Sequence, residues 1–254
     1  DSAGCGVKSS FGGDFNGTTN NDRTVYYEVV PINELATALW LESDRMGFLP
    51  AAMTQERLNA QKNIVQNERR QGVDNQPFGL AAENMMTALF PADNPYSWPV
   101  IGSLADLSAA SLDDVKGFFQ RYYAPNDATL SIVGDIDLAK AKELVSRYFG
   151  DIPRGPAIER PKIAQARLAA EKRLVLEDSK AQLPQMRIAW PTVGSDHADR
   201  YALTAAGAVL TADRTSRLTK LLVYDRQLAT NVFAGNSAFE NTGYFNISVT
   251  PRPN

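Results

Sequence analysis

A stretch rich in proline, alanine and arginine divides this chain of 254 residues into two parts. It reads IPRGPAIERPKIAQARLAAE and begins at Ile152. Prolines and glycines at this density interrupt regular structure and are typical of connecting segments. We therefore place a linker at residues 157–171, between a first domain at 1–156 and a second domain at 172–254.

Strand and helix patterns alternate before the linker. β-Branched and aromatic residues predict strands, and apolar residues at helical spacing predict helices. Ser111 with Asp114 forms a capping box that opens one helix, and Asp137 is expected to cap another. Strands are expected over 24–30 and 128–135, and helices over 32–48, 54–70, 77–90, 111–123 and 137–150.

The same alternation returns after the linker. Strands are expected over 172–178, 185–191, 229–236 and 243–250, with helices over 196–211 and 215–226 between them. Interleaved strands and helices in both parts indicate the α+β class, with layered antiparallel or mixed sheets packed against helices. The second domain ends on a predicted strand, so we expect its sheet to lack a C-terminal part.

Charge and composition argue against several functions. The net charge of −3 and the pI near 5.3 give no basic field for nucleic acid. No apolar run approaches the roughly 20 residues of a membrane-spanning helix. Zinc enzymes usually bind their metal through two or three imidazoles, whereas His197 is the single histidine. Cys5, the single cysteine, has no base beside it in the sequence that would make it a nucleophile.

Residues 117–156 carry a set of motifs found together in one family. The sequence GFFQRYYAPNDATLSIVGDIDLAKAKELVSRYFGDIPRGP has a helix ending in tyrosine, an asparagine after proline, a strand closing on Val-Gly-Asp and a helix ending in Tyr-Phe-Gly. These residues are Tyr123, Pro125, Asn126, Val133, Gly134, Asp135, Tyr148, Phe149 and Gly150. The combination resembles the pitrilysin/insulinase family of zinc peptidases, the inverzincins (peptidase family M16). FNGTTNNDRTVYYEVVP resembles the family's substrate strand, and RTSRLTKLLVYDRQLATNVFA resembles the Ser-Arg-Leu helix of its second, related domain.

The resemblance implies a zinc site that this sequence holds only in part. The family binds zinc through a His-x-x-Glu-His helix, whose glutamate activates water, and through a glutamate of a later helix. No His-x-x-Glu-His motif occurs here, and the family's order would place it before Asp1. We therefore expect zinc as a cofactor only if that helix precedes the chain, and we expect the first domain to lack its N-terminal part.

Glu68 matches the later zinc ligand of the family. It ends a valine-containing helix, and a carboxylate in this role lowers the net charge of the site while leaving zinc an open position. Gln61 stands two helical turns earlier, where family members often have a second glutamate. The alternative is a solvated glutamate at a polar helix end, because glutamates are mostly exposed.

Asn16, Gly17, Thr18 and Thr19 match the strand with which the family binds peptide substrates. Backbone hydrogen bonds at such an exposed edge bind an extended peptide with little demand on its sequence. A small residue at Gly17 would allow the substrate backbone to approach closely. The alternative is an ordinary polar turn in front of a strand.

The resemblance also implies a partner. Family members have a second homologous half that grips the substrate with an arginine and a tyrosine, and Val223 and Thr230 occupy those positions here. This chain therefore resembles the metal-bearing half, and the gripping half would be a downstream repeat or a partner subunit. His197 is expected to be a polar surface residue, with Asp196 as the cap of the helix that follows.

Two functions stay open at this point. The first is a zinc-dependent metallopeptidase that hydrolyses peptides in a chamber between two homologous halves, although the chain as given lacks two histidines and the catalytic glutamate. The second is a non-catalytic structural or peptide-binding member of the same fold, since folds outlive their chemistry. The segments LWLESDRMGFL and QNERRQGVDNQPFG are similar to exported bacterial members, which suggests a soluble periplasmic or otherwise exported protein.

Overall fold

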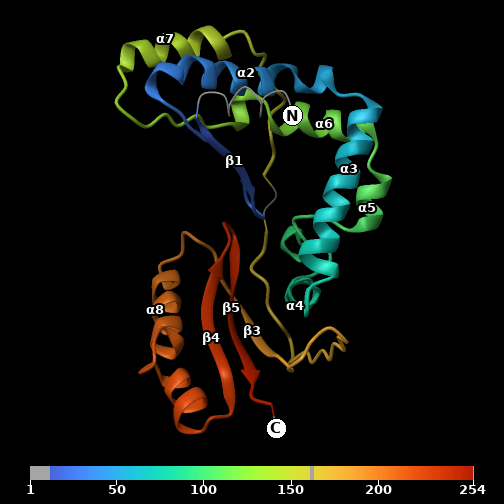
Figure 1. The fold of residues 1–254 in the computed structure, drawn as a ribbon, viewed down its shortest axis with the longest axis vertical. Helices are drawn as coiled ribbons and strands as arrows, with labels where there is room; N and C mark the ends of the chain where they lie inside the picture. The colour runs from blue at the N-terminus through green and yellow to red at the C-terminus, as the bar shows by residue number, and fades with distance from the viewer. Residues whose placement is uncertain (1–11, 161–162, 254) are drawn as a thin grey trace. The chain divides into compact units, whose positions relative to one another are not determined.

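The computed structural model describes residues 12–160 and 163–253, which form two compact units (Figure 1). The first unit contains the chain up to Gln66 together with Leu104–Arg160, and the second contains Asn67–Ser103 together with the chain after Arg160. The segment 67–103 therefore packs with the C-terminal part of the chain. The domain boundaries at residues 156 and 172 stay a prediction.

A β-hairpin begins the described part of the first unit. Strand β1 (Asp14–Thr19) pairs antiparallel with β2 (Thr24–Val29) over the whole length of both strands. The turn between them is closed by Asn20, whose side-chain oxygen accepts the backbone N–H groups of Asp22 and Arg23 at 2.9 and 3.0 Å. This hairpin confirms the strand predicted after the Asn-Gly-Thr-Thr segment.

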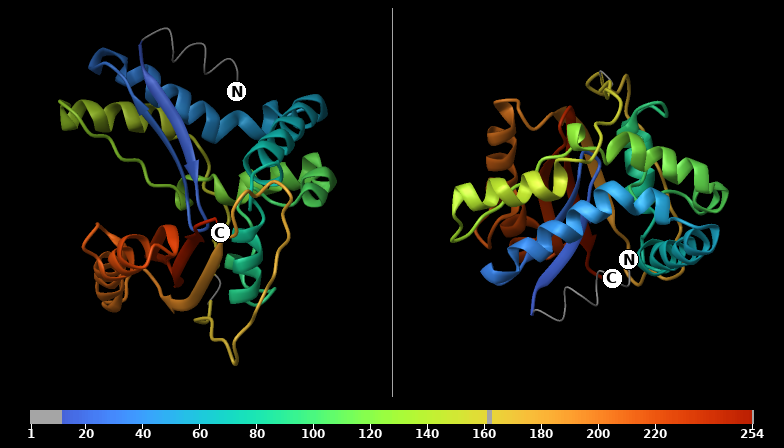
Figure 2. Two further views of the ribbon diagram at one scale, coloured as in Figure 1. Left: turned by 60° about the horizontal axis from the view of Figure 1, so that its bottom comes forward. Right: turned by 90° about the horizontal axis from the view of Figure 1, so that it is seen from above.

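Helices make up the rest of the first unit. The longest helix, α2, packs against α7 and α6, and α7 runs beside α2 in each view (Figures 1 and 2). The helical elements are η1 (Ile32–Glu34), α2 (Leu35–Ala52), α3 (Gln55–Arg69, whose last turn belongs to the second unit), α5 (Leu104–Ala109), α6 (Leu112–Tyr122), η4 (Pro125–Asp127) and α7 (Leu138–Phe149).

Both predicted helix caps of the first unit are confirmed. Ser111 Oγ accepts the Asp114 N–H at 3.1 Å, and the Asp114 carboxylate accepts the Ser111 N–H at 2.9 Å. The hydrogen bonds from the hydroxyl and the N–H of Ser111 hold the pKa of Asp114 below its ordinary value. Asp137 caps α7 by accepting the Lys140 N–H at 2.7 Å. These side chains fix where the two helices begin.

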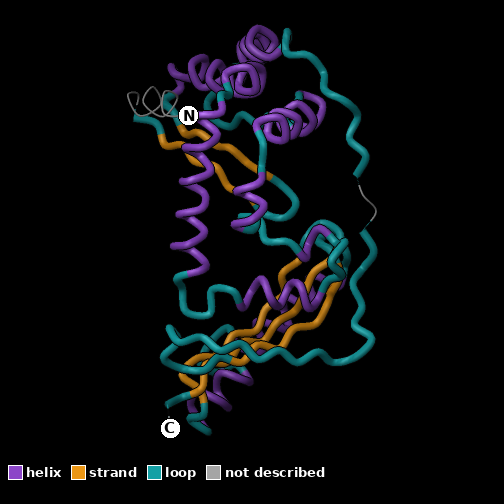
Figure 3. The backbone as a smooth tube through the Cα atoms, turned by 90° about the vertical axis from the view of Figure 1, so that its right-hand side faces the viewer, coloured by secondary structure: helices purple, strands orange, loops and turns teal. Residues whose placement is uncertain are grey.

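A three-stranded antiparallel sheet forms the centre of the second unit (Figures 1 and 3). Its strands are β3 (Met186–Val193), β4 (Ala229–Ala238) and β5 (Thr242–Pro251), in the order β3-β5-β4. Helix α8 (Asp199–Thr211) packs directly on β4, where the Thr211 hydroxyl accepts the Ala234 N–H at 2.8 Å. A π-helical segment, η5 (Thr219–Asp225), precedes β4.

The apolar core of the second unit joins the segment 67–103 to the sheet. Helix α4 (Ala81–Leu89) and the short η3 (Pro95–Ser97) contribute Leu89, Phe90 and Tyr96, of which Phe90 is 1% exposed. The Tyr96 ring stacks on Phe239 with centroids 4.7 Å apart. Helices and small antiparallel sheets thus build the α+β fold that the sequence predicts.

Three predictions for individual elements are wrong. Residues 128–135 and 172–178 form no strand and pair with no strand of the described chain, and Val133 and Val175 are 93% and 90% exposed. A strand requires a neighbouring backbone to receive its N–H and C=O groups, and neither segment has one here. Pro77 lies in a turn instead of opening a helix, because α4 begins only at Ala81. No helix among the described residues is both long and apolar enough to cross a membrane.

We predict that Phe90→Ala destabilises the second unit by about 3–5 kcal/mol, because it removes a buried ring and leaves a cavity. The matched control is Phe233→Ala on β4, whose side chain is 52% exposed and whose loss should cost about 1 kcal/mol. Urea unfolding of both variants measures the difference. Equal losses of stability in Phe90→Ala and Phe233→Ala would contradict the assignment of Phe90 to the core.

Candidate functional site

Glu68 lies at the C-terminal end of α3, one residue before the helix ends. Its side chain is exposed and has neither a hydrogen bond nor an ion pair within residues 12–160 and 163–253. The helical backbone continues beyond Glu68 as a π-helical turn over Arg70–Asp74, so Glu68 does not lie at the end of a helix dipole. Its carboxylate therefore faces solvent without a partner among the described residues.

The next residue, Arg69, anchors this helix end in the second unit. Its side chain is 8% exposed, and it donates to the two Glu83 carboxylate oxygens at 2.8 and 3.0 Å and to the Gly102 carbonyl at 2.7 Å. The hydrogen bonds to Glu83 are the main reason that the pKa of Arg69 rises above its ordinary value. A bidentate pair of this kind fixes orientation as well as distance. Glu68 is therefore an exposed carboxylate on a rigid support.

The backbone widens directly after Glu68 and Arg69. Residues Arg70–Asp74 form a π-helical turn, η2, in which the Asn75 N–H donates to the Arg70 carbonyl at 2.8 Å. Turns of this type are rare overall, and those that occur are often found at functional sites. Gln61, two turns before Glu68, is also exposed. The structure therefore leaves open one face of the helix that carries both residues.

Asn16, Gly17, Thr18 and Thr19 lie on β1, in the first unit, and all four are exposed. One edge of β1 pairs with β2, and no other described strand pairs with the remaining edge. The Asn16 side-chain oxygen accepts the Gly17 N–H at 2.8 Å. Asn16–Thr19 therefore lie on a strand and not in the polar turn of the alternative interpretation, and their role in binding substrate stays a prediction.

The glycine of this strand lies against an aromatic ring. A Cβ at Gly17 would come within 3.2 Å of Cδ1 of Tyr26 on β2. The Tyr26 ring in turn stacks under the Arg45 guanidinium, 3.4 Å from the ring centroid, and its hydroxyl lies 3.1 Å from that of Tyr123. Sequence reasoning missed Arg45 and Tyr123 because they come from α2 and the end of α6, far from β2 in the chain. A side chain at position 17 would therefore crowd the Tyr26 ring.

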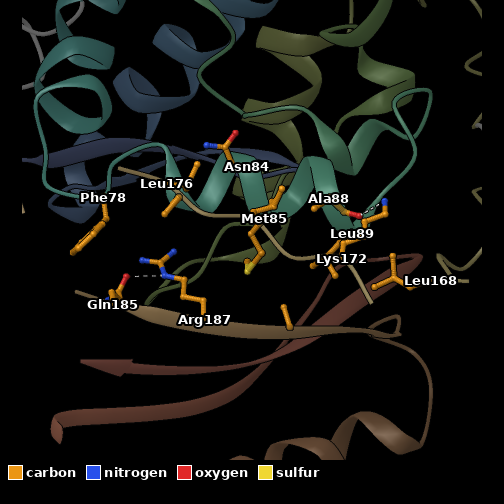
Figure 4. Close-up of a pocket in the computed structure, with 13 residues that line it drawn as sticks. Phe78, Asn84, Met85, Ala88, Leu89, Leu168, Lys172, Leu176, Gln185 and Arg187 are labelled. Atoms are coloured by element: carbon orange, nitrogen blue, oxygen red, sulfur yellow. Dashed lines mark hydrogen bonds between the residues drawn. The ribbon is translucent and has the colours of Figure 1, made fainter. Parts of the chain in front are cut away.

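A cavity of the second unit lies outside both candidate sites (Figure 4). It has a volume of about 200 Å³ and lies between α4, β3 and the segment 168–176. Met85, Leu89 and Leu168 give it an apolar wall, and Arg187 donates to Gln185 at 2.9 Å along its rim. None of the predicted site residues lines it.

Glu68 fits the role of one metal ligand, but the described chain supplies no complete set. Nowhere in residues 12–160 and 163–253 do three or more His, Cys, Asp or Glu side chains group closely enough to hold a metal. Glu68 belongs to the second unit and Asn16–Thr19 to the first, so the structure describes two separate sites. The further ligands of a zinc ion would have to come from outside the described residues.

The single histidine has a local structural role. Its Nδ1 accepts the Asp199 N–H at 3.1 Å at the start of α8, and its side chain is 54% exposed. The prediction of His197 as a polar surface residue near a helix start is confirmed. The prediction of Asp196 as the cap is wrong, because the cap position is Ala198 and His197 supplies the acceptor. Cys5 lies outside the described residues.

A stability change at alkaline pH is expected from Tyr26. Burial of its hydroxyl end, followed by the hydrogen bond to Tyr123, raises its pKa from 10.0 to about 12, although 43% of the whole side chain stays exposed. The folded protein then holds the phenolic proton more tightly than the unfolded chain does. The contribution of Tyr26 to stability is present below pH 10.0 and is lost as the pH rises to about 12.

Urea unfolding of the wild type and of Tyr26→Phe across this pH range measures the effect. The wild type should lose more stability than the variant between the two pKa values. Parallel losses in the two proteins would contradict the assignment to Tyr26.

A second stability change is expected at the support of Glu68. Glu83→Gln leaves the Arg69 guanidinium without its carboxylate and should destabilise the second unit by about 2 kcal/mol. Glu143→Gln is the matched control, because Glu143 pairs with Lys140 at the surface with 61% of its side chain exposed. Its loss should cost less than about 0.5 kcal/mol. Thermal unfolding compares the two, and a Glu143 effect as large as that of Glu83 would refute the anchor.

The fold described above is that of a class of α+β proteins that contains zinc peptidases. Residues 109–254, more than half of the chain, match the family model described as the peptidase M16 inactive domain. The chain belongs to peptidase family M16. The matched residues exclude both Glu68 and Asn16–Thr19.

Individual relatives agree with this membership. The zinc protease PqqE of Helicobacter pylori is 26% identical over 250 residues, which cover 98% of this chain and 56% of that protein. The uncharacterized zinc protease YmxG of Bacillus subtilis is 24% identical over 239 residues, which cover 93% of this chain and 56% of YmxG. The chain thus spans about half the length of the curated relatives it matches.

Solved structures share the fold. A crystal structure of a protease from Helicobacter pylori superposes with a TM-score of 0.88 at 26% identity and covers 99% of this chain and 60% of that one. A peptidase M16 inactive domain from Pseudomonas fluorescens gives a TM-score of 0.82 at 21% identity, with the same two shares, 99% and 60%. Pitrilysin gives 0.71 at 17% identity and covers 98% of this chain and 27% of pitrilysin.

Proposed function

We propose that this chain is part of a zinc-dependent metallopeptidase and contributes one metal ligand and the substrate-binding strand. The observation that carries the proposal is Glu68, an exposed carboxylate that has no hydrogen bond or ion pair among the described residues and directly precedes the anchored Arg69. The names of the relatives as zinc proteases support the choice of metal and reaction.

Glu68 acts in this proposal as the carboxylate ligand of zinc. Bound zinc supplies a water of lowered pKa and polarises the scissile carbonyl. The carboxylate of Glu68 removes one positive charge from the site, and its rigid support limits the ligand to a small range of positions. Two histidines and the glutamate that activates water belong to the His-x-x-Glu-His helix, which this chain does not contain.

The open edge of β1 binds the peptide substrate in an extended conformation. Backbone N–H and C=O groups of Asn16–Thr19 pair with those of the substrate, which gives affinity with little dependence on its side chains. The Asn16 side chain now accepts the Gly17 N–H. The Asn16 side chain would have to rotate away before the Gly17 N–H could donate to a substrate carbonyl. In the free protein, the Asn16 oxygen therefore takes the place of that carbonyl.

The proposal includes a homologous half that grips the substrate and closes the chamber. Val223 lies in η5 and Thr230 on β4, where the Thr230 hydroxyl donates to the Thr250 carbonyl at 3.1 Å. Neither side chain can supply the cationic and phenolic contacts of the gripping pair. That pair would come from a downstream repeat or a partner subunit. Export to the periplasm belongs to the same proposal, since one structural relative is a periplasmic protease of Escherichia coli.

A non-catalytic, peptide-binding role is the second candidate. Gln61 favours it, because an amide at this position cannot carry the charge that family members place there. The description of the matched family model as an inactive domain is compatible with it as well. In this candidate, β1 binds peptides and Glu68 has no metal.

We predict that Glu68→Gln removes zinc binding and peptide hydrolysis from the protein expressed from its whole reading frame. A neutral amide binds zinc far less well than a carboxylate, because charge neutralisation is lost. Zinc content by atomic absorption and cleavage of a fluorogenic peptide library, with and without a chelator, measure the two effects. Glu56→Gln, on the exposed first turn of α3, is the matched control and should keep both properties.

Each outcome separates the candidates. Hydrolysis that survives complete removal of zinc would overturn the metallopeptidase. A wild-type protein that binds peptide, but neither binds zinc nor cleaves the peptide, would establish the non-catalytic role instead.

A further inference from the structure

Tyr26 on β2 lies across the backbone of β1. Gly17 and Tyr26 are directly opposite each other in the β1–β2 hairpin. Cδ1 and Cε1 of the Tyr26 ring lie 3.2 and 3.4 Å from the place that a Gly17 Cβ would take. The ring therefore fills the space that a side chain on β1 would occupy at this position. An aromatic ring laid over a glycine of the neighbouring strand compensates for the missing side chain.

The backbone of Gly17 points toward the edge of β1 with which no other described strand pairs. Its N–H donates to the Asn16 side chain at 2.8 Å and so does not serve β2. In an antiparallel pair, residues that do not bond to their opposite number turn both N–H and C=O toward the other edge, and their side chains come closer together. Gly17 and Tyr26 form a pair of this kind, in agreement with the short distance between the ring and Gly17.

A peptide strand on that edge would bring one of its side chains up to the Tyr26 ring. Opposite residues of neighbouring strands point to the same face of a sheet, with Cβ atoms about 4.5–5.5 Å apart. Side chains of next-but-one strands are normally separated by about 9.5 Å, with a third side chain between them. Here no side chain intervenes, because Gly17 has none and the ring has already crossed to β1. The peptide residue beside Gly17 therefore comes within contact distance of the Tyr26 ring.

Two contacts hold the Tyr26 ring in this position. Cζ of the Arg45 guanidinium lies 3.4 Å from the ring centroid, and the Tyr123 hydroxyl lies 3.1 Å from that of Tyr26. Arg45 is itself paired with Glu42, one turn before it on α2. The Tyr26 side chain stays 43% exposed, so part of the ring is open to a ligand. A ring that is fixed before the peptide arrives loses little conformational entropy on binding.

We propose that Tyr26 recognises the substrate side chain that lies beside Gly17, and that this position of the peptide favours an aromatic or large aliphatic residue. This role of Tyr26 rests on the proposed function of β1 as the strand that binds peptides, and it adds side-chain selectivity to a contact made otherwise through the backbone. It does not involve the metal, so it applies equally to a peptidase and to a non-catalytic peptide-binding protein.

The test compares two labelled peptides of alanine, serine and glutamine that differ only in a central phenylalanine or alanine. Fluorescence anisotropy gives their dissociation constants for the protein expressed from its whole reading frame, and mass spectrometry verifies that the peptides stay intact. The phenylalanine peptide should bind about 3- to 10-fold more tightly. Tyr26→Ala removes the ring, and Gly17→Ala places a methyl group where the ring now lies, so both should abolish this preference. Tyr26→Phe keeps the ring and should keep the preference.

Tyr27 provides the matched control. It follows Tyr26 on β2, is exposed to the same extent (42% against 43%) and points to the opposite face of the hairpin, because successive strand residues alternate. Tyr27→Ala should leave the ratio of the two dissociation constants unchanged. A wild-type protein that binds both peptides equally, or Tyr26→Ala and Gly17→Ala proteins that keep the wild-type ratio, would overturn the proposal.

An N-methylated form of the phenylalanine peptide distinguishes this failure from a failure of the proposed function. N-Methylation of every residue removes the N–H groups that pair with a strand edge and should abolish binding to β1. If it does so and the side-chain preference survives in Tyr26→Ala and Gly17→Ala, Tyr26 has only a structural role and β1 still binds the peptide. If the N-methylated peptide binds as well as its parent, β1 is not the binding strand, and the selectivity of Tyr26 falls with it.

Discussion

The second unit depends on the hydrogen bonds that the buried Arg69 guanidinium donates to Glu83 and to the Gly102 carbonyl. A charge of this kind is stable away from water only when its partners surround it, and its partners come from three places in the chain: Glu83 on α4, the Gly102 carbonyl and, at 3.7 Å, Asp74 of the π-turn. One side chain thereby ties the end of α3 to three segments that follow it in the chain. These contacts fix the backbone at the residue that follows the exposed Glu68, although the Glu68 side chain makes none of them.

Local signals in the sequence were sufficient for much of the fold. The capping box of Ser111 and Asp114, the cap at Asp137 and the strands β2–β5 were predicted because each is encoded by neighbouring residues. The strands at 128–135 and 172–178 failed for the opposite reason. Their residues favour an extended backbone, but a strand also needs a partner, and pairing is a property of distant segments.

The candidate site shows the same division. Glu68 and the Asn16–Thr19 strand were proposed through family motifs, whereas the contact between the Tyr26 and Tyr123 hydroxyls was not, since it spans 97 residues. Tyr26 was visible as part of a strand, but its contact with Arg45 depends on how α2 packs. The wrong choice of Asp196 over His197 is instructive, because an imidazole nitrogen can accept an N–H as a carboxylate does.

Gln61 does not decide between the two candidate functions, although it departs from the family pattern. Seven residues separate it from Glu68, so the two lie on one face of α3 about 10 Å apart. At that distance a glutamate in place of Gln61 would add negative potential near a metal, but it could not replace a ligand. The amide therefore lowers the negative potential near Glu68 and leaves in place the carboxylate that we propose as the ligand. The choice between enzyme and peptide-binding protein depends on Glu68 and on what meets its carboxylate.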